Sequence, residues 1–307
     1  MLKKKALRKI LITTLTVVIL LMVYMIPTNT SSINKLDVDK TIEYIDSEVG
    51  YAYLLNDNDL LVRTEFLMGE YTELKEKATN IINNLINSNT VPNGLKNIIP
   101  KKTKIQLLEI KEKYLTLSFS KEILEIDDKY QEKLIESISF SLFELEDIEK
   151  ISILVEKENI NKYFKNIPKE ITREFGINKK YDIKSFKNIQ KVIVYYLNEI
   201  DDKKYLVPVT SYINDSEEKI KIIIESLSSN YIYEPNLISM LDSKTELINY
   251  EIKDDIMHLN FNNSIFMTDG NILEEVVYTI SNSVFDSYDV NKIVFNVENR
   301  KIEEVIK

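Results

Sequence analysis

The sequence predicts an α+β protein in which two tandem domains of the same build follow an N-terminal transmembrane helix. Apolar spacings typical of strands and helices alternate in the order ββαββαβ, and that order occurs twice. Residues of the first copy also match residues 142 positions later. A long apolar segment with a basic flank precedes both copies. We therefore expect each copy to form a small sheet with two helices on one face.

The N-terminal region is typical of a signal anchor. Residues 1–9 carry five positive charges, and residues 10–27 are mostly apolar. As a helix the apolar stretch would span roughly 25 Å, close to the hydrocarbon thickness of a bilayer. We expect a cytoplasmic basic segment (1–9), one transmembrane helix (10–27), a spacer (28–50) and an extracytoplasmic body at the cell membrane. A cleaved signal peptide and a buried helix of a soluble protein are the alternatives.

The first copy is expected to span residues 51–158. Its second half contains two apolar runs with period two, typical of a hairpin, followed by a helical pattern and a final strand. The elements predicted in order are strands at 51–55 and 60–66, a helix at 72–87, a hairpin at 104–110 and 114–120, a helix at 130–143 and a strand at 150–155.

The second copy is expected to span residues 191–303, after a linker at 159–190. The linker is rich in Lys and contains Pro168 and Gly176, so we expect some helix there, packed against one or both domains. The elements predicted for the second copy are strands at 191–197 and 204–213, a helix around 220–227, a hairpin at 246–252 and 256–262, a helix at 273–284 and a strand at 292–297.

The repeat is an ungapped match at 142 residues over both halves of the unit. Its clearest pairs are Thr103 and Thr245, Glu109 and Glu251, Leu117 and Leu259, Phe119 and Phe261, Ile138 and Ile280, Phe143 and Phe285, Lys150 and Lys292, Val155 and Val297, Asn56 and Asn198. Two copies at this period are tandem domains, because solenoid repeats run to about 20–50 residues. Ile138 and Ile280 fall on the apolar stripes of the helices, so we expect them at the packing centre of each domain.

Composition excludes several classes of chemistry. The chain has 5 Gly and no glycine-rich phosphate loop, and it has no Cys, so thiol nucleophiles, disulfides and thiolate metal sites are absent. Five of the 40 basic residues lie before Ile10, which leaves 35 against 49 acidic residues. A body with this charge repels nucleic acid, so no nucleic-acid partner is expected.

His258 is the single histidine, and it alternates with Leu259 and Phe261 in a predicted strand. Alternation alone explains it as an exposed strand residue, and a catalytic or metal-binding histidine is the weaker alternative. Ser281 and Ser283 lie on a predicted helix without the Gly-x-Ser-x-Gly or Ser-x-x-Lys context of a nucleophile.

Acidic pairs occur in predicted turns, at Asp127-Asp128, Asp201-Asp202 and Asp254-Asp255. Paired carboxylates can act as acid and base, but tight turns also select Asp. The run from Asn56 to Asp59 has the oxygen ligands of a calcium loop but lacks its Gly and Glu. We therefore predict no catalytic, cofactor-binding or metal-binding residues and no cofactor. The 18 Tyr residues are compatible both with a glycan- or protein-binding surface and with half-buried strand positions.

Interaction is the function that these residues favour. A tethered body without a catalytic constellation suits a scaffold or assembly factor, and free sheet edges can pair with other subunits or with a second copy of the chain. The alternative is a peptidoglycan-binding or wall-remodelling protein, which would need two convergent carboxylates or a metal site to act on the polymer.

Several segments resemble the GerM domain family of bacterial sporulation and spore-germination proteins. They are Leu206-Val207-Pro208-Val209-Thr210, the helix at 222–227, the hairpin from Thr245 to Phe261, Val277-Tyr278-Thr279-Ile280, the strand from Val290 to Phe295, and Ile99-Pro100-Lys101-Lys102-Thr103. The first copy departs from the family pattern at Leu67-Met68-Gly69 and Asn87-Ser88-Asn89, and the lipid-anchoring Cys of some relatives is missing.

The resemblance implies a non-enzymatic, extracytoplasmic protein of spore-forming bacteria. It implies partners among the membrane proteins of sporulation, in the channel complex between mother cell and forespore, and a fold similar to the ring-building modules of secretion assemblies. These motifs concern packing and turns, so they specify a fold better than a mechanism.

Overall fold

The structure is a computed structural model that describes residues 48–87, 91–183, 187–214, 217–229, 232, 236–267 and 270–307. The chain divides into two units, and Ser47–Lys307 is the unit to which the described residues belong. The transmembrane helix predicted at 10–27 lies outside the described residues. Among the helices that are described, none has the length and apolar character needed to cross a membrane.

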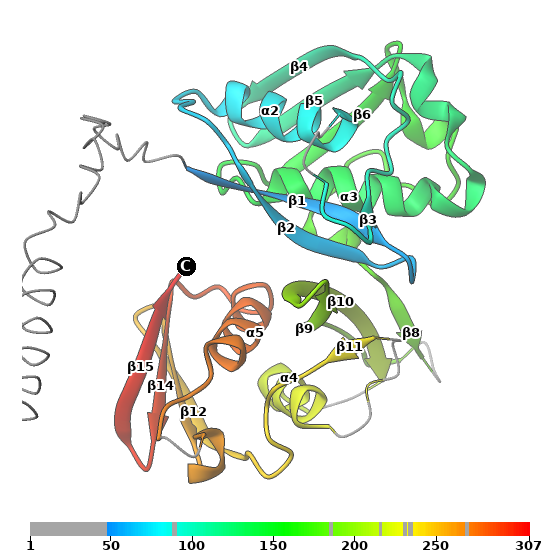
Figure 1. The fold of residues 1–307 in the computed structure, drawn as a ribbon. Helices are drawn as coiled ribbons and strands as arrows, with labels where there is room; N and C mark the ends of the chain where they lie inside the picture. The colour runs from blue at the N-terminus through cyan, green and yellow to red at the C-terminus, as the bar shows by residue number, and fades with distance from the viewer. Residues whose placement is uncertain are drawn as a thin grey trace, which may run out of the picture. The chain divides into compact units, whose positions relative to one another are not determined.

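The first copy contains two helices and seven strands (Figure 1). In chain order they are β1 (Val49–Asn56), β2 (Leu61–Leu67), α2 (Leu74–Asn87), β3 (Leu95–Lys96), β4 (Ile105–Lys111), β5 (Tyr114–Phe119), α3 (Gln131–Phe143), β6 (Lys150–Val155) and β7 (Glu158–Asn159). The segment that follows has short 3-10 turns at Ile160–Lys162 and Arg173–Phe175 and then β8 (Lys180–Asp182).

The second copy repeats this order and ends in an additional long strand. Its elements are β9 (Ile189–Ile200), β10 (Lys203–Asn214), α4 (Lys219–Ser228), β11 (Leu237–Ile238), β12 (Leu247–Lys253), β13 (Ile256–Phe261), α5 (Glu274–Phe285), β14 (Lys292–Val297) and β15 (Arg300–Ile306). No strand was predicted after Val297. In the first copy the corresponding place holds the two-residue β7 and a single bridge from Ile171 to Ile151.

The strands of each copy are divided between two sheets, so the prediction of one sheet per domain is wrong. Four-stranded sheets have the orders β4-β5-β6-β7 and β12-β13-β14-β15. The remaining strands join in one seven-stranded sheet, β11-β9-β10-β2-β1-β3, with β8 on β10. The periodicity of a strand shows that one face is buried, but it does not identify the neighbouring strand, and here β2 of one copy pairs with β10 of the other.

Helix α3 is buried from Leu134 to Phe143, including its serines, so other elements pack against it on all sides. Ser137 Oγ donates to the carbonyl of Tyr53 (2.6 Å), and Ser141 Oγ accepts from the Tyr53 N–H (2.9 Å). In the second copy Ser283 Oγ accepts from the Tyr195 N–H (2.8 Å). The helix serines thus provide hydrogen-bond partners for backbone groups on the outer edges of β1 and β9. On these edges the short strands β3 and β11 pair with two residues each.

Ile138 and Ile280 are fully buried, as predicted, and lie on the helices at the centre of each copy. Apolar residues of the sheets surround them, among them Phe119 in the first copy and Phe261 in the second. The helices α3 and α5 therefore form the packing centre of each copy, as their apolar stripes indicated.

The repeat carries a three-residue insertion, so the prediction of an ungapped match is wrong at the first hairpin. Asn56 and Asn198 correspond at 142 residues, because both pair with the short strand after the first helix of their copy. On the return strands, Leu61 pairs with Leu55 whereas Leu206 pairs with Leu197. Leu61 therefore corresponds to Leu206, at 145 residues. A longer hairpin adds residues at its tip without moving the elements on either side.

Candidate functional site

The residues that were weighed above as candidates for catalysis or metal binding have mainly structural roles. His258 lies on a strand, β13, as predicted, but it is half-buried and not exposed, because Glu251 and Val294 lie opposite it in the neighbouring strands. Among the described residues no three His, Asp or Glu side chains lie close enough to hold a metal ion. Ser283 binds the backbone of β9 as described above.

Two of the three acidic pairs form hairpin turns, as predicted, and the third, Asp127-Asp128, instead begins a short 3-10 helix. Asp201 and Asp202 join β9 to β10, Asp254 and Asp255 join β12 to β13, and all four residues have positive φ. Positive φ at both central residues defines a type I′ turn, which short polar side chains tolerate best. Asp127 is the N-cap residue of a short 3-10 helix from Asp128 to Tyr130.

The Asn56–Asp59 run contributes to the contact between the two copies. Asn56 Oδ1 accepts from the N–H groups of Asn58 and Leu60, so it stabilises its own turn. Its Nδ2 donates to Asn198 Oδ1 at 3.0 Å. Because Asn56 and Asn198 are counterparts in the repeat, the two copies contact each other here through equivalent residues.

The same contact between equivalent residues is found along β2 and β10, the strands that join the copies. Leu206 pairs antiparallel with Arg63, which places Val207 opposite Val62. At the 145-residue spacing of these strands, Val62 and Val207 are counterparts, and both are fully buried. The two copies therefore meet as the subunits of a symmetric dimer do, through the same surface on each.

Asn178 completes this joint where the strands separate. Pro208 has no N–H to offer Leu61, so the ladder stops after the Arg63 pair. Asn178 Oδ1 accepts from the Leu61 N–H, and its Nδ2 donates to the carbonyls of Leu61 and Pro208, each at 2.8 Å. A side-chain amide here takes the place of a backbone amide. Asn178 has φ 48°, a conformation that Asn tolerates better than most residues.

A buried carboxylate holds the Asn178 segment in place. Glu136 on α3 is 1% exposed and accepts from the Asn178 N–H (3.0 Å) and from Lys133 Nζ (3.2 Å). Burial raises the pKa of Glu136, while the Lys133 charge and the Asn178 hydrogen bond lower it. Next to Asn178, the backbone N–H and C=O of Ile177 bind Thr210. The predicted linker thus contacts both copies.

Two matching polar clusters flank the joint. In the first, Glu144 accepts from the Tyr53 hydroxyl (2.7 Å) and from Arg63 Nε (2.9 Å) and Nη2 (2.8 Å). Burial and then Glu144 raise the pKa of Tyr53. The Arg63 guanidinium also lies 3.6 Å from the centre of the Tyr51 ring.

The second cluster uses the counterpart residues. Asp286 accepts from the Tyr195 hydroxyl (2.6 Å) and from Arg173 Nη1 (3.2 Å). Arg173 comes from the segment between the copies and also donates to the carbonyl of Phe143 in the first copy. Sequence reasoning missed both clusters, since they contain no motif. The repeat itself was the available signal, because Tyr53 and Tyr195, and Glu144 and Asp286, are separated by the repeat length.

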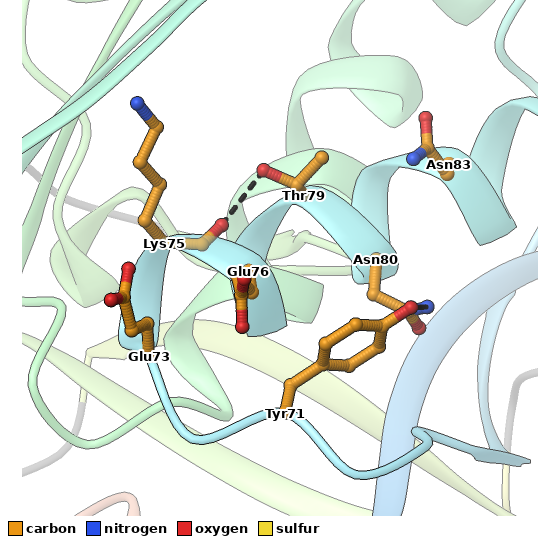
Figure 2. A pocket seen from close by; sticks show the side chains of 7 residues that line it. All are labelled: Tyr71, Glu73, Lys75, Glu76, Thr79, Asn80 and Asn83. Atoms are coloured by element: carbon orange, nitrogen blue, oxygen red, sulfur yellow. Dashed lines mark hydrogen bonds between the residues drawn. The ribbon is translucent and has the colours of Figure 1, made fainter.

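An open depression of about 340 Å³ lies along the outer side of α2. Figure 2 shows the Tyr71 ring standing beside the helix, with polar side chains along the rest of the depression. Asn80 Nδ2 donates to the Tyr71 hydroxyl (3.3 Å), and the ring rests against Gly69. The lining residues are Tyr71, Glu73, Lys75, Glu76, Thr79, Asn80 and Asn83.

The outer strands of the four-stranded sheets carry exposed apolar side chains. Leu107 on β4 is 45% exposed, and on β12 Ile248 and Ile252 are 56% and 45% exposed. β4 and β12 each pair with one strand, so one backbone edge of each has no strand partner within the described part of the chain. Edges of this kind are where further strands or subunits add.

Glu304 on β15 forms ion pairs with Lys292 on β14 and with Lys301 of its own strand, both at 2.6 Å. These hydrogen bonds lower the pKa of Glu304 from 4.5 to about 2. The stabilisation is therefore complete above pH 4.5 and is lost as the pH falls toward about 2. We expect Glu304→Gln to lower the free energy of unfolding at pH 7, and the difference from the wild type to disappear near pH 2. Urea unfolding at pH 7, 4 and 2 measures this, and a difference that persists at pH 2 contradicts it.

Fold and site together define a class of protein: two α+β repeats in one chain, joined edge to edge through a shared sheet. A family model described as "Germane: Sporulation and spore germination" matches residues 51–161 and 193–303, which is most of the chain. The chain belongs to this family, as its resemblance to GerM domains predicted.

Two comparisons with characterised proteins agree with the family. The spore germination protein GerM of Bacillus subtilis (strain 168) is 25% identical over 208 residues, covering 63% of this chain. The match spans 57% of that relative's length, less than two thirds of it. The solved structure of the tandem GerMN domains of the sporulation protein GerM from Bacillus subtilis has a TM-score of 0.76 and 23% identity. It covers 85% of this chain and 97% of that one. The tandem GerMN fold is therefore shared.

Proposed function

We propose that the chain is a non-enzymatic scaffold or assembly factor of sporulation or germination that acts by protein–protein contact. One observation carries this: both copies match the sporulation and germination family, and they are fused into a shared sheet. Asn178 hydrogen-bonds Leu61 of the first copy and Pro208 of the second, so it serves the joint, and the Tyr53–Glu144 hydrogen bond lies beside it within the first copy. The exposed strands β4 and β12 are then available for partners.

The proposed place of action is the outer face of a cell membrane. The basic segment 1–9 and the apolar segment 10–27 support a single anchor with the N-terminus in the cytoplasm. The proposed partners are membrane proteins of the sporulation machinery, including the complex that links mother cell and forespore. A second copy of the chain is a further candidate, because β4 and β12 are similar exposed edges.

Deleting the gene tests this proposal in a spore-forming host. We expect a clear loss of heat-resistant spores or of germination, because an assembly factor acts through the complex it helps to form. Expression of the full-length chain should restore the wild-type yield. Normal yields of spores and normal germination in the deletion strain would contradict the proposal.

The second candidate is a peptidoglycan-binding protein, and the depression along α2 favours it. An aromatic face beside amide and carboxylate groups suits a sugar ring, which stacks on the one and hydrogen-bonds to the other. Pull-down of the full-length chain with purified peptidoglycan separates the two candidates. Retention that Tyr71→Ala abolishes would support wall binding, and retention with release of muropeptides would point to wall remodelling.

A further inference from the structure

The outer side of β2 is open beyond the joint. β2 pairs with β1 along its whole length, but on its other side it pairs with β10 at Arg63 alone. From Glu65 to Leu67 no strand of the described part of the chain covers this side. Leu67 is 74% exposed, the largest exposure of any large hydrophobic side chain in the described residues. The backbone edge and an apolar side chain are therefore presented together.

The counterpart of this edge on β10 is occupied. At the 145-residue spacing, Phe66, Leu67 and Met68 correspond to Ser211, Tyr212 and Ile213. Those three residues of β10 pair in parallel with β8, Lys180 to Asp182. The Tyr181 ring stacks on Tyr212, the counterpart of Leu67, with 5.1 Å between ring centres and 10° between planes. The pairing of β8 with β10 therefore shows, within the same molecule, how a strand binds at the position equivalent to the open β2 edge.

The helix beside the occupied edge shows what such a segment needs. Lys179, one residue before β8, bonds Glu132 on α3 at 2.6 Å. The N–H of Asn178 binds Glu136, which lies one helical turn further along. The segment bound at β10 thus makes three kinds of contact. A basic side chain binds a carboxylate, an N–H group donates to an acceptor, and an aromatic ring packs over the strand.

The open edge has helix residues that correspond to those beside the occupied edge. The counterparts of Glu132 and Glu136 at 142 residues are Glu274 and Tyr278 on α5. Both are exposed, and the Tyr278 hydroxyl donates to Glu274 at 2.8 Å. The hydrogen bond to Glu274, then burial and the charges of Glu274, Tyr51 and Glu65, raise the pKa of Tyr278. By the correspondence between the copies, α5 stands to the β2 edge as α3 stands to the β10 edge.

We propose that the open β2 edge binds an extended segment of a partner polypeptide, added in parallel as β8 is added to β10. The segment carries a basic residue opposite Glu274 and an apolar or aromatic residue over Leu67. A basic residue is expected in the partner segment because three acidic side chains, Glu65, Glu70 and Glu274, are exposed. The inference rests on the proposed function and adds to it the chemistry of the partner.

The occupant is assigned to another polypeptide on grounds of charge. The residues of this chain that precede β1 at the spacing of β8 belong to the stretch 34–46. That stretch contains four acidic residues, Asp37, Asp39, Glu43 and Asp46, against Lys35 and Lys40. A net negative segment is repelled by an acidic edge, whereas the segment bound to β10 brings Lys179 and Lys180.

Binding of a short peptide to the full-length chain in detergent tests the proposal. The probe is a fluorescent peptide with the sequence of residues 176–183, which contains the segment bound to β10. The matched control peptide has both lysines replaced by glutamate. We expect saturable binding of the probe, at least 10-fold weaker binding of the control, and at least 10-fold weaker binding of the probe to Leu67→Lys. The matched variant Ile306→Lys, at an apolar position on β15 that is 71% exposed, should bind as the wild type does.

Each other outcome overturns the proposal. Absence of probe binding, or equal binding of Leu67→Lys and Ile306→Lys, shows that the open edge is not the site. Probe binding that appears only after deletion of residues 28–46 shows that the chain's own segment occupies the edge. Both substitutions are at exposed positions, so circular dichroism should confirm that the variants fold. Because binding is measured in vitro, its failure leaves the sporulation phenotype as a separate test of the proposed function.

Discussion

Replacing Asn178 by alanine is expected to lower the free energy of unfolding by about 3–5 kcal/mol. The substitution leaves the N–H and C=O of Leu61 and the carbonyl of Pro208 without their partner in a buried joint. A buried polar group without a hydrogen bond costs about 1–3 kcal/mol, and alanine at positive φ adds strain. In a domain of this size the loss corresponds to a fall of roughly 10 °C in Tm. Chemical unfolding of the variant measures it.

Two further variants separate the causes. Asn178→Gly removes the amide but accepts positive φ, so it should cost slightly less than Asn178→Ala. Asn188 has the same backbone conformation, with φ 52°, and is exposed. Asn188→Ala should therefore cost below about 1 kcal/mol. If Asn178→Ala costs no more than Asn188→Ala, the side-chain amide does not hold the strands together.

Replacing Glu144 by alanine is expected to cost about 3 kcal/mol. The carboxylate is the shared acceptor of Arg63 and of the fully buried Tyr53 hydroxyl. Its removal leaves a guanidinium whose side chain is 17% exposed without its ion partner. Loss of one partner of a buried pair costs about 3–5 kcal/mol, and partial exposure reduces that figure. Urea unfolding of the single variants and of Arg63→Ala/Glu144→Ala gives the coupling energy, which should be about 2 kcal/mol.

The pair Lys113–Glu149 is the matched control for this cycle. Its side chains are 57% and 59% exposed, so its coupling should be much smaller than that of Arg63–Glu144 and should weaken in salt. The Arg63–Glu144 coupling should change little between low and high salt. Equal coupling energies for the two pairs would show that Glu144 acts as an exposed surface residue and not as the partner of a largely buried guanidinium.

The elements themselves were predictable because they depend on local patterns. The alternation of Leu115, Leu117 and Phe119 in β5 and the spacing around Ile138 and Ile280 in the helices follow from one buried face per element. The repeat of these patterns supplied the tandem architecture, which the family match then confirmed. The acidic turns were also predictable, since a two-residue hairpin turn requires positive φ at both positions.

The joint between the copies was not predictable, because it depends on the partner of each strand. β2 could pair with any edge of the right length, and a buried strand on either side leaves the same sequence pattern. Asn178 lies in a segment without periodicity, so its role depends on the distant residues Leu61 and Pro208. Glu136 sits next to the apolar stripe of α3, where a charged residue usually marks the solvent side.

The open β2 edge became visible only by comparing the two copies in space. A single exposed leucine such as Leu67 is unremarkable on a protein surface. Its meaning comes from Tyr212, the counterpart that β8 covers. The three-residue insertion hides this relation in the sequence, since the 142-residue spacing aligns Leu67 with Val209 instead.

The shared sheet makes the two copies one folding body, and amide hydrogen exchange of the full-length chain is the direct measurement of this property. Val62 and Val207 are the counterpart residues that face each other in the joint, and both are fully buried. Their amides should exchange with the same free energy of opening, equal to that of global unfolding. Exchange of Val207 through a lower-energy opening while Val62 stays protected, or the reverse, would show that the copies unfold separately and would contradict it.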